Sequence, residues 1–197
     1  MVIIGIIGRK DKTDSGLLVD IMYNDISKAI RKSGGIPIGI RNNNILDYID
    51  ICDGFILQGG SEIDTNNYEV IKEIKKRDKP LLGICLGMQE MAMYHEGIML
   101  DIPNHFKKHL ITIKEDSLLY RIVNKDKIMV NSRHKSAIKK TSIDISSYSI
   151  DDYIIESVED KNCKFFLGVE WHPENMYDSD ENSKKIFDYF IDVCKKE

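Results

Sequence analysis

The segment Lys79–Gln89 reads KPLLGICLGMQ, and its pattern decides the fold. Its first half, Pro80–Ile84, is short and apolar, which is typical of a buried strand. Its second half begins a Met- and Ala-rich run that continues to Tyr94 and predicts a helix. Cys85 therefore lies in a turn between a strand and a helix, with a glycine two positions before it and another two positions after it.

Two interpretations of Cys85 follow from this position. A sharp strand–turn–helix bend presents its side chain in a strained, exposed corner, as in the nucleophile elbow of Gly-x-Ser-x-Gly hydrolases. The start of a helix also stabilises a thiolate, so we expect the pKa of Cys85 to fall, and the free N–H groups there can hold an oxyanion. Alternatively, Cys85 is a buried structural cysteine, like many at strand ends.

Length and composition limit the class of protein. A chain of 197 residues predicts one domain spanning residues 1–197. With 28 basic and 32 acidic residues, the net charge of −4 gives no footprint for nucleic acid or an anionic membrane.

The apolar start is too short for a membrane span and lacks signal-peptide flanks, so it predicts a first strand. The cysteines show neither CxxC pairing nor metal-ligand spacing, so we expect no disulfide framework, no metal site and a cytoplasmic location; they are Cys52, Cys85, Cys163 and Cys194.

The first half of the chain alternates strand and helix patterns, which predicts a parallel sheet. Val2–Gly8 and Ile36–Ile40 are strand-like, and Leu17–Lys32 between them carries a helical apolar stripe. Arg9–Ser15 is predicted to be a polar loop. Gly54–Leu57 is a further buried strand. Other helices are predicted at Ile45–Cys52, Asn67–Arg77 and Asp180–Lys195, and Gly97–Asn104 is predicted to be a loop or short strand.

From His109 the pattern changes to short β-rich runs separated by small turns. These runs are HLITI, KIMVNS, SYSI, YIIESV and FFLGVEW. They predict additional strands, partly antiparallel, that extend the parallel sheet.

A second chemical motif, His172-Pro173-Glu174, ends the last of these runs. Pro173 stops the strand, and alternate residues share a face, so His172 and Glu174 lie on one side. A carboxylate so placed can accept the second imidazole N–H and fix the tautomer. Because a thiol nucleophile needs a base and an orienting group, we predict a Cys85–His172–Glu174 relay at one sheet edge. Taken separately, His172 could be an ordinary core or surface histidine, and Glu174 could be a solvated acidic residue.

Two further segments suit a binding site. Gly59 and Gly60 follow a buried strand at its carboxyl end, where open α/β sheets place their ligand loops, although a plain tight turn is the alternative. Val130–Ser136 brings hydrogen-bonding side chains and His134 into a predicted loop, which suits a polar substrate, the alternative being a capped turn. No chemistry is assigned to His95, His105 and His109.

Together these segments resemble the class I glutamine amidotransferase superfamily, and within it the γ-glutamyl hydrolase group (peptidase C26-like) that includes γ-glutamyl-γ-aminobutyrate hydrolases. The resemblance covers nearly the whole chain, and in chain order it is carried by Leu57–Gly60, Gly83–Gln89, Val130–His134 and Val169–Glu174. The chain departs from the group at Glu62 and Thr65, where Asp and Pro are usual, and at Lys135-Ser136, where a Gln is common. These departures leave the substrate open.

The resemblance implies a three-layer α/β/α fold with a mostly parallel central sheet, flavodoxin-like, plus added antiparallel strands. It also implies that Cys85 is the nucleophile, His172 its base and Glu174 the orienting acid. The N–H groups of Gly60 and Leu86 would form the oxyanion hole. The residues expected to bind substrate are Gly59, Gln89, Asn131, Ser132 and His134, with no metal or organic cofactor.

The sequence leaves three functions open. The first is a free-standing cysteine hydrolase that cleaves a small γ-glutamyl compound through a glutamyl thioester. The second is a glutaminase subunit that supplies ammonia to a separate synthase partner. The third is a non-catalytic protein that binds γ-glutamyl compounds or another protein. Neither the amine leaving group nor the oligomeric state, which could be a homodimer, follows from the sequence.

Overall fold

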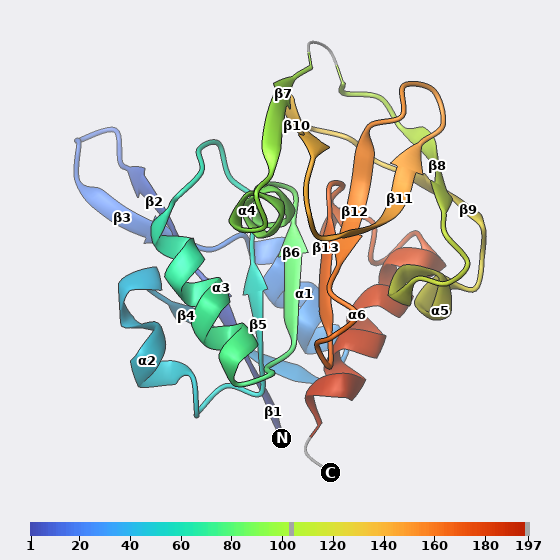
Figure 1. Cartoon of the computed structure of the whole chain (residues 1–197). Helices are drawn as coiled ribbons and strands as arrows, with labels where there is room; N and C mark the ends of the chain where they lie inside the picture. Colours follow the sequence, from blue (N-terminus) through green and yellow to red (C-terminus); the bar gives the residue numbers. More distant parts are fainter. Residues whose placement is uncertain (103–104, 196–197) are drawn as a thin grey trace.

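A nine-stranded sheet forms the centre of the molecule in the computed structural model, which describes residues 1–102 and 105–195 (Figure 1). Its strand order is β4-β1-β5-β6-β13-β12-β11-β8-β9. The first five strands pair in parallel, and they are β4 (Gly35–Ile40), β1 (Val2–Ile7), β5 (Gly54–Leu57), β6 (Leu81–Ile84) and β13 (Phe166–Val169). The remaining four pair antiparallel, and they are β12 (Ile155–Glu159), β11 (Asp144–Ser149), β8 (His109–Ile113) and β9 (Lys127–Val130). The predicted mostly parallel sheet with added antiparallel strands is thus confirmed.

Helices cover both faces of the sheet, which gives three layers (Figure 1). On one face lie α1 (Asn24–Lys32), α5 (Leu118–Val123) and α6 (Glu181–Cys194); on the other lie α2 (Ile45–Tyr48), α3 (Asn66–Lys76) and α4 (Leu86–Tyr94). Ile56 and Leu82 pack with the first group, whereas their neighbours Phe55 and Leu81 pack with the second. Alternate strand residues therefore fill two separate cores, as the buried apolar runs require.

Two small antiparallel pairs lie outside the main sheet. They are β2 (Arg9–Lys12) with β3 (Leu18–Ile21), and β7 (Ile98–Asp101) with β10 (Ser136–Lys140). Short 3-10 turns occur at Asn42–Asn44 and Pro173–Asn175.

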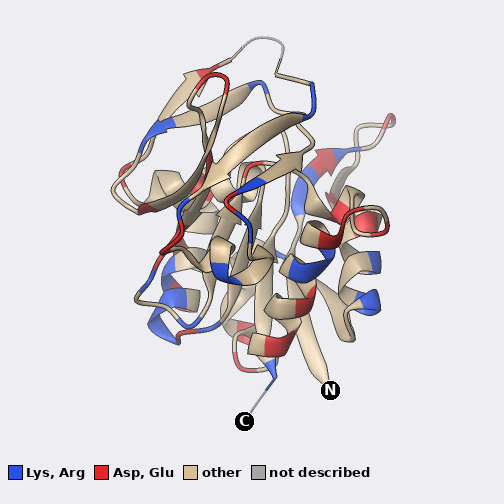
Figure 2. Cartoon of the chain, turned by 90° about the vertical axis from the view of Figure 1, so that its right-hand side faces the viewer, with Lys and Arg blue, Asp and Glu red and all other residues tan. Residues whose placement is uncertain are grey.

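Basic and acidic segments are interspersed over the chain (Figure 2). Among the described residues, none of the helices has the length and apolar character needed to span a membrane.

The β2–β3 hairpin corrects the predicted helix Leu17–Lys32 and the predicted loop Arg9–Ser15. The helix begins only at Asn24, because Gly16 adopts a φ of 81° and turns the chain back into a hairpin. Leu18, counted in the helical stripe, is 76% exposed. The apolar residues at helical spacing in this hairpin therefore do not form the buried face of a helix.

Other boundaries differ less. The predicted helix Ile45–Cys52 is shorter and ends at Tyr48. Within Gly97–Asn104, Ile98–Asp101 forms β7, and residues 103–104 lie outside the described part of the chain. Helix α5 was not predicted, because its six residues are too few for a helical period to stand out.

Candidate active site

Cys85 joins β6 to α4 in a strained conformation, with φ of 52° and ψ of −111°. Non-glycine residues rarely adopt positive φ, and such strain persists only where the surrounding structure holds it. The N–H of Cys85 donates to the carbonyl oxygen of Val169 at 2.8 Å, so the end of β13 anchors the turn. The predicted strand–turn–helix elbow is therefore present.

Helix α4 approaches β5 closely at Gly87. A Cβ atom at this position would lie only 2.0 Å from the carbonyl oxygen of Leu57, which is backbone and cannot rotate away. Only glycine permits this approach. The glycine after the cysteine thus allows α4 to start directly above the sheet.

His172 and Glu174 form a hydrogen-bonded pair after the end of β13. His172 Nδ1 donates to Glu174 Oε1 at 2.7 Å, because an ionised carboxylate can only accept. In the neutral ring this leaves the lone pair on Nε2, as a general base requires. Both side chains are largely buried.

Asn131 holds the backbone of His172 from both sides. Its Oδ1 accepts from the His172 N–H at 2.8 Å, and its Nδ2 donates to the His172 carbonyl oxygen at 2.9 Å. The two bonds fix the position of the imidazole. Asn131 was predicted to contact substrate; the observed bonds hold the backbone of His172, and contact with substrate stays a prediction.

A pocket of about 330 Å³ opens where β5, β6 and β13 end. Gly60, Cys85 and His172 each follow one of these strands and line it together with Glu174. Open α/β sheets place ligands at the carboxyl ends of their strands. Arg133, from the predicted loop Val130–Ser136, also lines the pocket. The sequence did not identify the other lining residues, which are Tyr23, Asn24, Asp25 and Asn175.

Gly59 lies between the sulfur-bearing elbow and the imidazole. A Cβ at this position would be 3.1 Å from His172 Cε1 and 3.7 Å from Cys85 Cβ. The two side chains therefore approach the same backbone position, although they are 87 positions apart in the sequence. Gly59 provides space in the structure, and its contact with substrate stays a prediction.

Arg9 is buried beneath the loop that follows β5. Its Nε donates to the carbonyl oxygens of Gln58 and Gly59, both at 3.1 Å. The Gly59–Gly60 peptide is trans, so the N–H of Gly60 points away from the carbonyl that Arg9 holds. The guanidinium therefore fixes the direction of the N–H group predicted to bind the oxyanion.

Glu90 holds Arg9 in place from the interior of α4. Its two oxygens accept from Arg9 Nη1 at 2.6 Å and Nη2 at 2.9 Å, a paired arrangement stronger than a single bond. Glu90 also accepts from the backbone N–H of Asp64 and the side chain of Asn67. Sequence reasoning missed both members of the pair; the available signal was a charged residue in the apolar helix that follows Cys85.

The expected fall in the pKa of Cys85 is wrong for this structure. Burial raises its pKa, and the carboxylates of Glu170 and Glu174 raise it further. A hydrogen bond from the Leu86 N–H and the charge of Arg9 act in the opposite direction but do not outweigh burial. The helix start does favour the thiolate, as predicted, but desolvation is the larger effect.

Three other predicted site residues, Gln89, Ser132 and His134, are buried and do not line this pocket. Gln89 Nε2 donates to Glu170 Oε1 at 2.6 Å, the Ser132 hydroxyl donates to the carbonyl of His105, and His134 Nδ1 donates to the carbonyl of Ser136 at 3.1 Å. Their polar groups are thus occupied by protein partners. Direct contact of Gln89, Ser132 or His134 with substrate stays a prediction.

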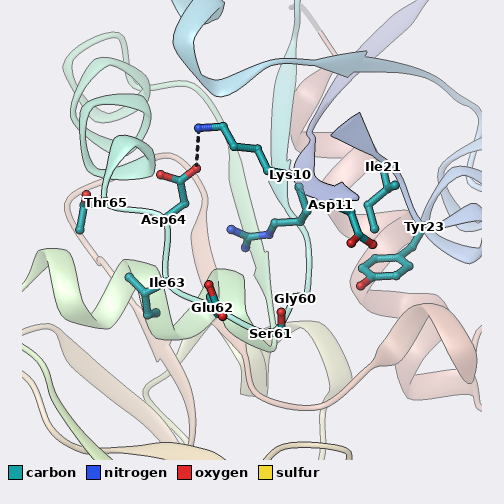
Figure 3. Close-up of a pocket in the computed structure, with 11 residues that line it drawn as sticks. Lys10, Asp11, Ile21, Tyr23, Gly60, Ser61, Glu62, Ile63, Asp64 and Thr65 are labelled. Atoms are coloured by element: carbon teal, nitrogen blue, oxygen red, sulfur yellow. Dashed lines mark ion pairs between the residues drawn. The ribbon is translucent and has the colours of Figure 1, made fainter. Parts of the chain in front are cut away.

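A second pocket of about 370 Å³ adjoins the first, since Tyr23 and Gly60 line both (Figure 3). Charged side chains of both signs line it, with Lys10 Nζ 3.8 Å from Asp64 Oδ2. Glu62, the residue that departs from the group's usual Asp, also lines it. The two pockets together could hold a larger ligand than either one alone.

Comparison with known proteins agrees with the fold. The family model described as Peptidase C26 matches residues 64–174. The chain is 32% identical to "Putative glutamine amidotransferase PB2B2.05" of Schizosaccharomyces pombe, over 85% of this chain and 80% of that protein. It is 29% identical to a glutamine-hydrolyzing GMP synthase subunit of Archaeoglobus fulgidus, over 88% of this chain and 94% of that protein.

A solved structure shows the same fold. The glutaminase domain of Trypanosoma brucei CTPS, with bound acivicin, superposes with a TM-score of 0.77 over 98% of this chain and 94% of that chain. At 15% identity this similarity concerns the fold alone. From the family match and the sequence relatives, this chain belongs to the peptidase C26 family of the class I glutamine amidotransferase-like proteins.

Proposed function

We propose that this chain is a cysteine hydrolase that cleaves the γ-glutamyl amide bond of a small molecule. The observation that carries the proposal is the meeting of Cys85, His172 and Glu174 at one pocket, with Glu174 2.7 Å from His172 Nδ1. A nucleophile, a base and an orienting acid are the groups that amide hydrolysis through a thioester requires.

The reaction begins with a protonated thiol, because burial raises the pKa of Cys85. His172 Nε2 takes the proton as the sulfur attacks the amide carbonyl, and the N–H groups of Gly60 and Leu86 stabilise the oxyanion. His172 then protonates the leaving amine as the C–N bond breaks. Finally His172 activates a water that attacks the thioester, which releases glutamate and restores the thiol.

Arg133 is the cation we assign to the substrate's α-carboxylate. It lines the pocket with Cys85, and a guanidinium matches a carboxylate in geometry and charge. The adjoining pocket, which charged side chains of both signs line, would receive the amine side of the substrate. A polar amine therefore suits it as leaving group.

A second candidate function is a glutaminase subunit that works with a synthase. It is supported by the similarity to the GMP synthase subunit along nearly the whole chain. In that case the amide would be glutamine, and ammonia would pass to the partner. Stimulation of glutamine hydrolysis by an added synthase would favour this candidate, whereas efficient cleavage of other γ-glutamyl amides by the chain alone would favour the first.

Glutamate release from a panel of γ-glutamyl compounds, glutamine included, tests the proposal. We expect Cys85→Ala to abolish release while the far-UV circular dichroism stays unchanged. Cys163→Ala, at a half-buried cysteine outside the pocket, is the matched control and keeps the parent rate. Release by Cys85→Ala at the parent rate would refute the proposal.

A further inference from the structure

Three histidines outside the catalytic pocket gather at the start of β8. The ring of His105 lies 4.7 Å from that of His109 and 4.6 Å from that of His134, centroid to centroid. Two carboxylates face them: Glu156 Oε1 is 2.9 Å from His109 Nε2, and Asp152 Oδ2 is 3.2 Å from His105 Nε2. One donor atom from each of His105, His109 and Glu156 lies within 4.8 Å of the others. One metal ion could bridge this spacing with small side-chain adjustments, since such bonds are about 2.0–2.2 Å long.

The hydrogen bonds of His109 direct a lone pair at Glu156. His109 Nδ1 is 3.2 Å from the carbonyl oxygen of Lys107, and because a carbonyl can only accept, Nδ1 carries the hydrogen. In the neutral ring Nε2 is then an acceptor, and it faces a carboxylate oxygen at 2.9 Å. Two acceptors repel each other at this distance, so either a hydrogen on the ring or on the carboxyl group, or a metal ion bound to both atoms, must compensate them.

The two ring nitrogens of His105 also face different partners: Nε2 faces a carboxylate, and Nδ1 faces the other histidines of the cluster. His105 Nδ1 lies 2.8 Å from Ser132 Oγ and carries the ring hydrogen in the metal-free protein, because the Ser132 hydroxyl already donates to the His105 carbonyl. Transfer of that hydrogen to Nε2, where the Asp152 carboxylate can accept it at 3.2 Å, frees Nδ1 as a ligand atom. Nδ1 lies 3.0 Å from His134 Nε2, on the side of the cluster. Metal-binding histidines usually donate their other N–H to a carboxylate or a backbone carbonyl, as His105 and His109 can do here.

Glu156 supplies an independent observation. Its side chain is fully buried, and among the described residues its Oε2 has no hydrogen-bond partner. A buried carboxylate is costly unless it is paired or coordinates a metal. A divalent cation would compensate the charge of this group and could take either oxygen.

We propose that His105, His109 and Glu156 bind a divalent transition-metal ion of the Zn²⁺ type, through two imidazole nitrogens and one carboxylate oxygen. Two nitrogen donors suit Zn²⁺ and its neighbours, whereas Mg²⁺ and Ca²⁺ prefer oxygen alone. Sequence analysis assigned no metal site and no role to the two histidines. The reason is that Glu156 is distant in sequence and reaches them only through the antiparallel half of the sheet.

The site is linked to the catalytic elbow by side-chain contacts. His134 Nδ1 is 3.5 Å from Glu170 Oε1, and the same oxygen accepts from Gln89 in α4 at 2.6 Å. An ion that joins β12 to the start of β8 would therefore stabilise the framework beside Cys85. The expected role is structural, so binding should be visible without any turnover.

The test is a titration of the full chain with Co²⁺ alone, followed by competition with Zn²⁺. The parent for this series is the Cys85→Ser protein, which lacks the thiol of the catalytic pocket, and it is first dialysed against a chelator. We expect one equivalent of Co²⁺ to bind with visible d–d absorption, Zn²⁺ to displace it, and the melting temperature to rise on binding.

Three variants separate this site from adventitious binding. Glu156→Gln and His109→Asn should each weaken binding at least tenfold and remove the rise in melting temperature. His95→Asn is the control, since His95 contacts Lys75 and lies outside the cluster, and it should bind like the parent. Absence of saturable binding in the parent would overturn the proposal even if a variant failed to fold. Equal binding by folded Glu156→Gln and His109→Asn would also overturn it.

Discussion

At Cys85 two opposing effects act on one thiol. Burial, followed by the charge of Glu170, raises its pKa, and the Leu86 N–H lowers it. The thiol is therefore protonated in the resting protein at neutral pH. A base that takes the proton only when substrate arrives fits this state better than a permanent thiolate.

Replacement of Glu170 by Gln tests this electrostatic account. Burial and the charge of Glu156 raise the pKa of Glu170 well above its usual range, so Glu170 acts on the sulfur as a charge only at alkaline pH. The substitution removes that charge, so the pKa of Cys85 should fall and iodoacetamide should react faster in the alkaline part of the pH profile. The pH midpoint of alkylation should move to lower pH. Glu159→Gln is the matched control, because Glu159 is also a buried carboxylate and does not contribute to the pKa shift of Cys85. Identical pH profiles for Glu170→Gln and the parent would contradict the account.

Asn131→Ala should lower kcat by about 10- to 100-fold with little change in KM, because a small displacement of a catalytic group is enough for such a loss. The variant removes both hydrogen bonds that hold the backbone of His172. Asn131→Asp keeps the acceptor and loses the donor, so its kcat should be intermediate. Steady-state measurement of kcat and KM for the parent and both variants checks this prediction. A raised KM with unchanged kcat would instead support the substrate contact predicted from the sequence.

At the scale of elements, the loop after β5 depends on the buried Arg9–Glu90 pair. Glu90→Gln leaves the buried guanidinium without its carboxylate and should lower the free energy of unfolding by about 3–5 kcal/mol. Replacing both residues by Met should recover part of this stability but not the activity, because the carbonyls of Gln58 and Gly59 lose their donor. Denaturant unfolding and glutamate release measure the two effects. A double variant as active as the parent would contradict the role of Arg9.

Individual elements differ in how well the sequence predicts them. Gly54–Leu57 and Leu81–Ile84 were predictable because an uninterrupted apolar run between turn signals is typical of a strand buried on both faces. The β2–β3 hairpin was not, because Leu18 and its neighbours follow a helical spacing while lying exposed. In such segments tertiary contacts determine whether a helix or a strand forms, and the local sequence pattern does not reveal those contacts.

The same distinction holds for the candidate site. Cys85 and the His172–Glu174 pair lie in short local motifs, so their types and spacing allowed a catalytic role to be predicted. Arg9 acts through residues about fifty positions away, and it became visible only in the folded chain. The histidine cluster around Glu156 was hidden for the same reason.

At the scale of the whole molecule, local stability should follow position in the sheet. β6 and β13 are fully buried at the centre, whereas β3 pairs only with β2 and is partly exposed. Backbone amides open more readily where few buried contacts hold them. Hydrogen exchange should therefore be slowest in β6 and β13 and much faster in β3. Equal protection of β3 and the central strands would show that the hairpin is held by contacts outside the structure described.

The central claim is that Cys85 carries the γ-glutamyl group during turnover. Acid quenching of the protein while it cleaves a γ-glutamyl anilide, followed by digestion and mass spectrometry, tests it most directly. We expect one γ-glutamyl group attached to the peptide that contains Cys85, and none in Cys85→Ala. Turnover without this adduct in the quenched parent, or an adduct on another residue, would contradict it.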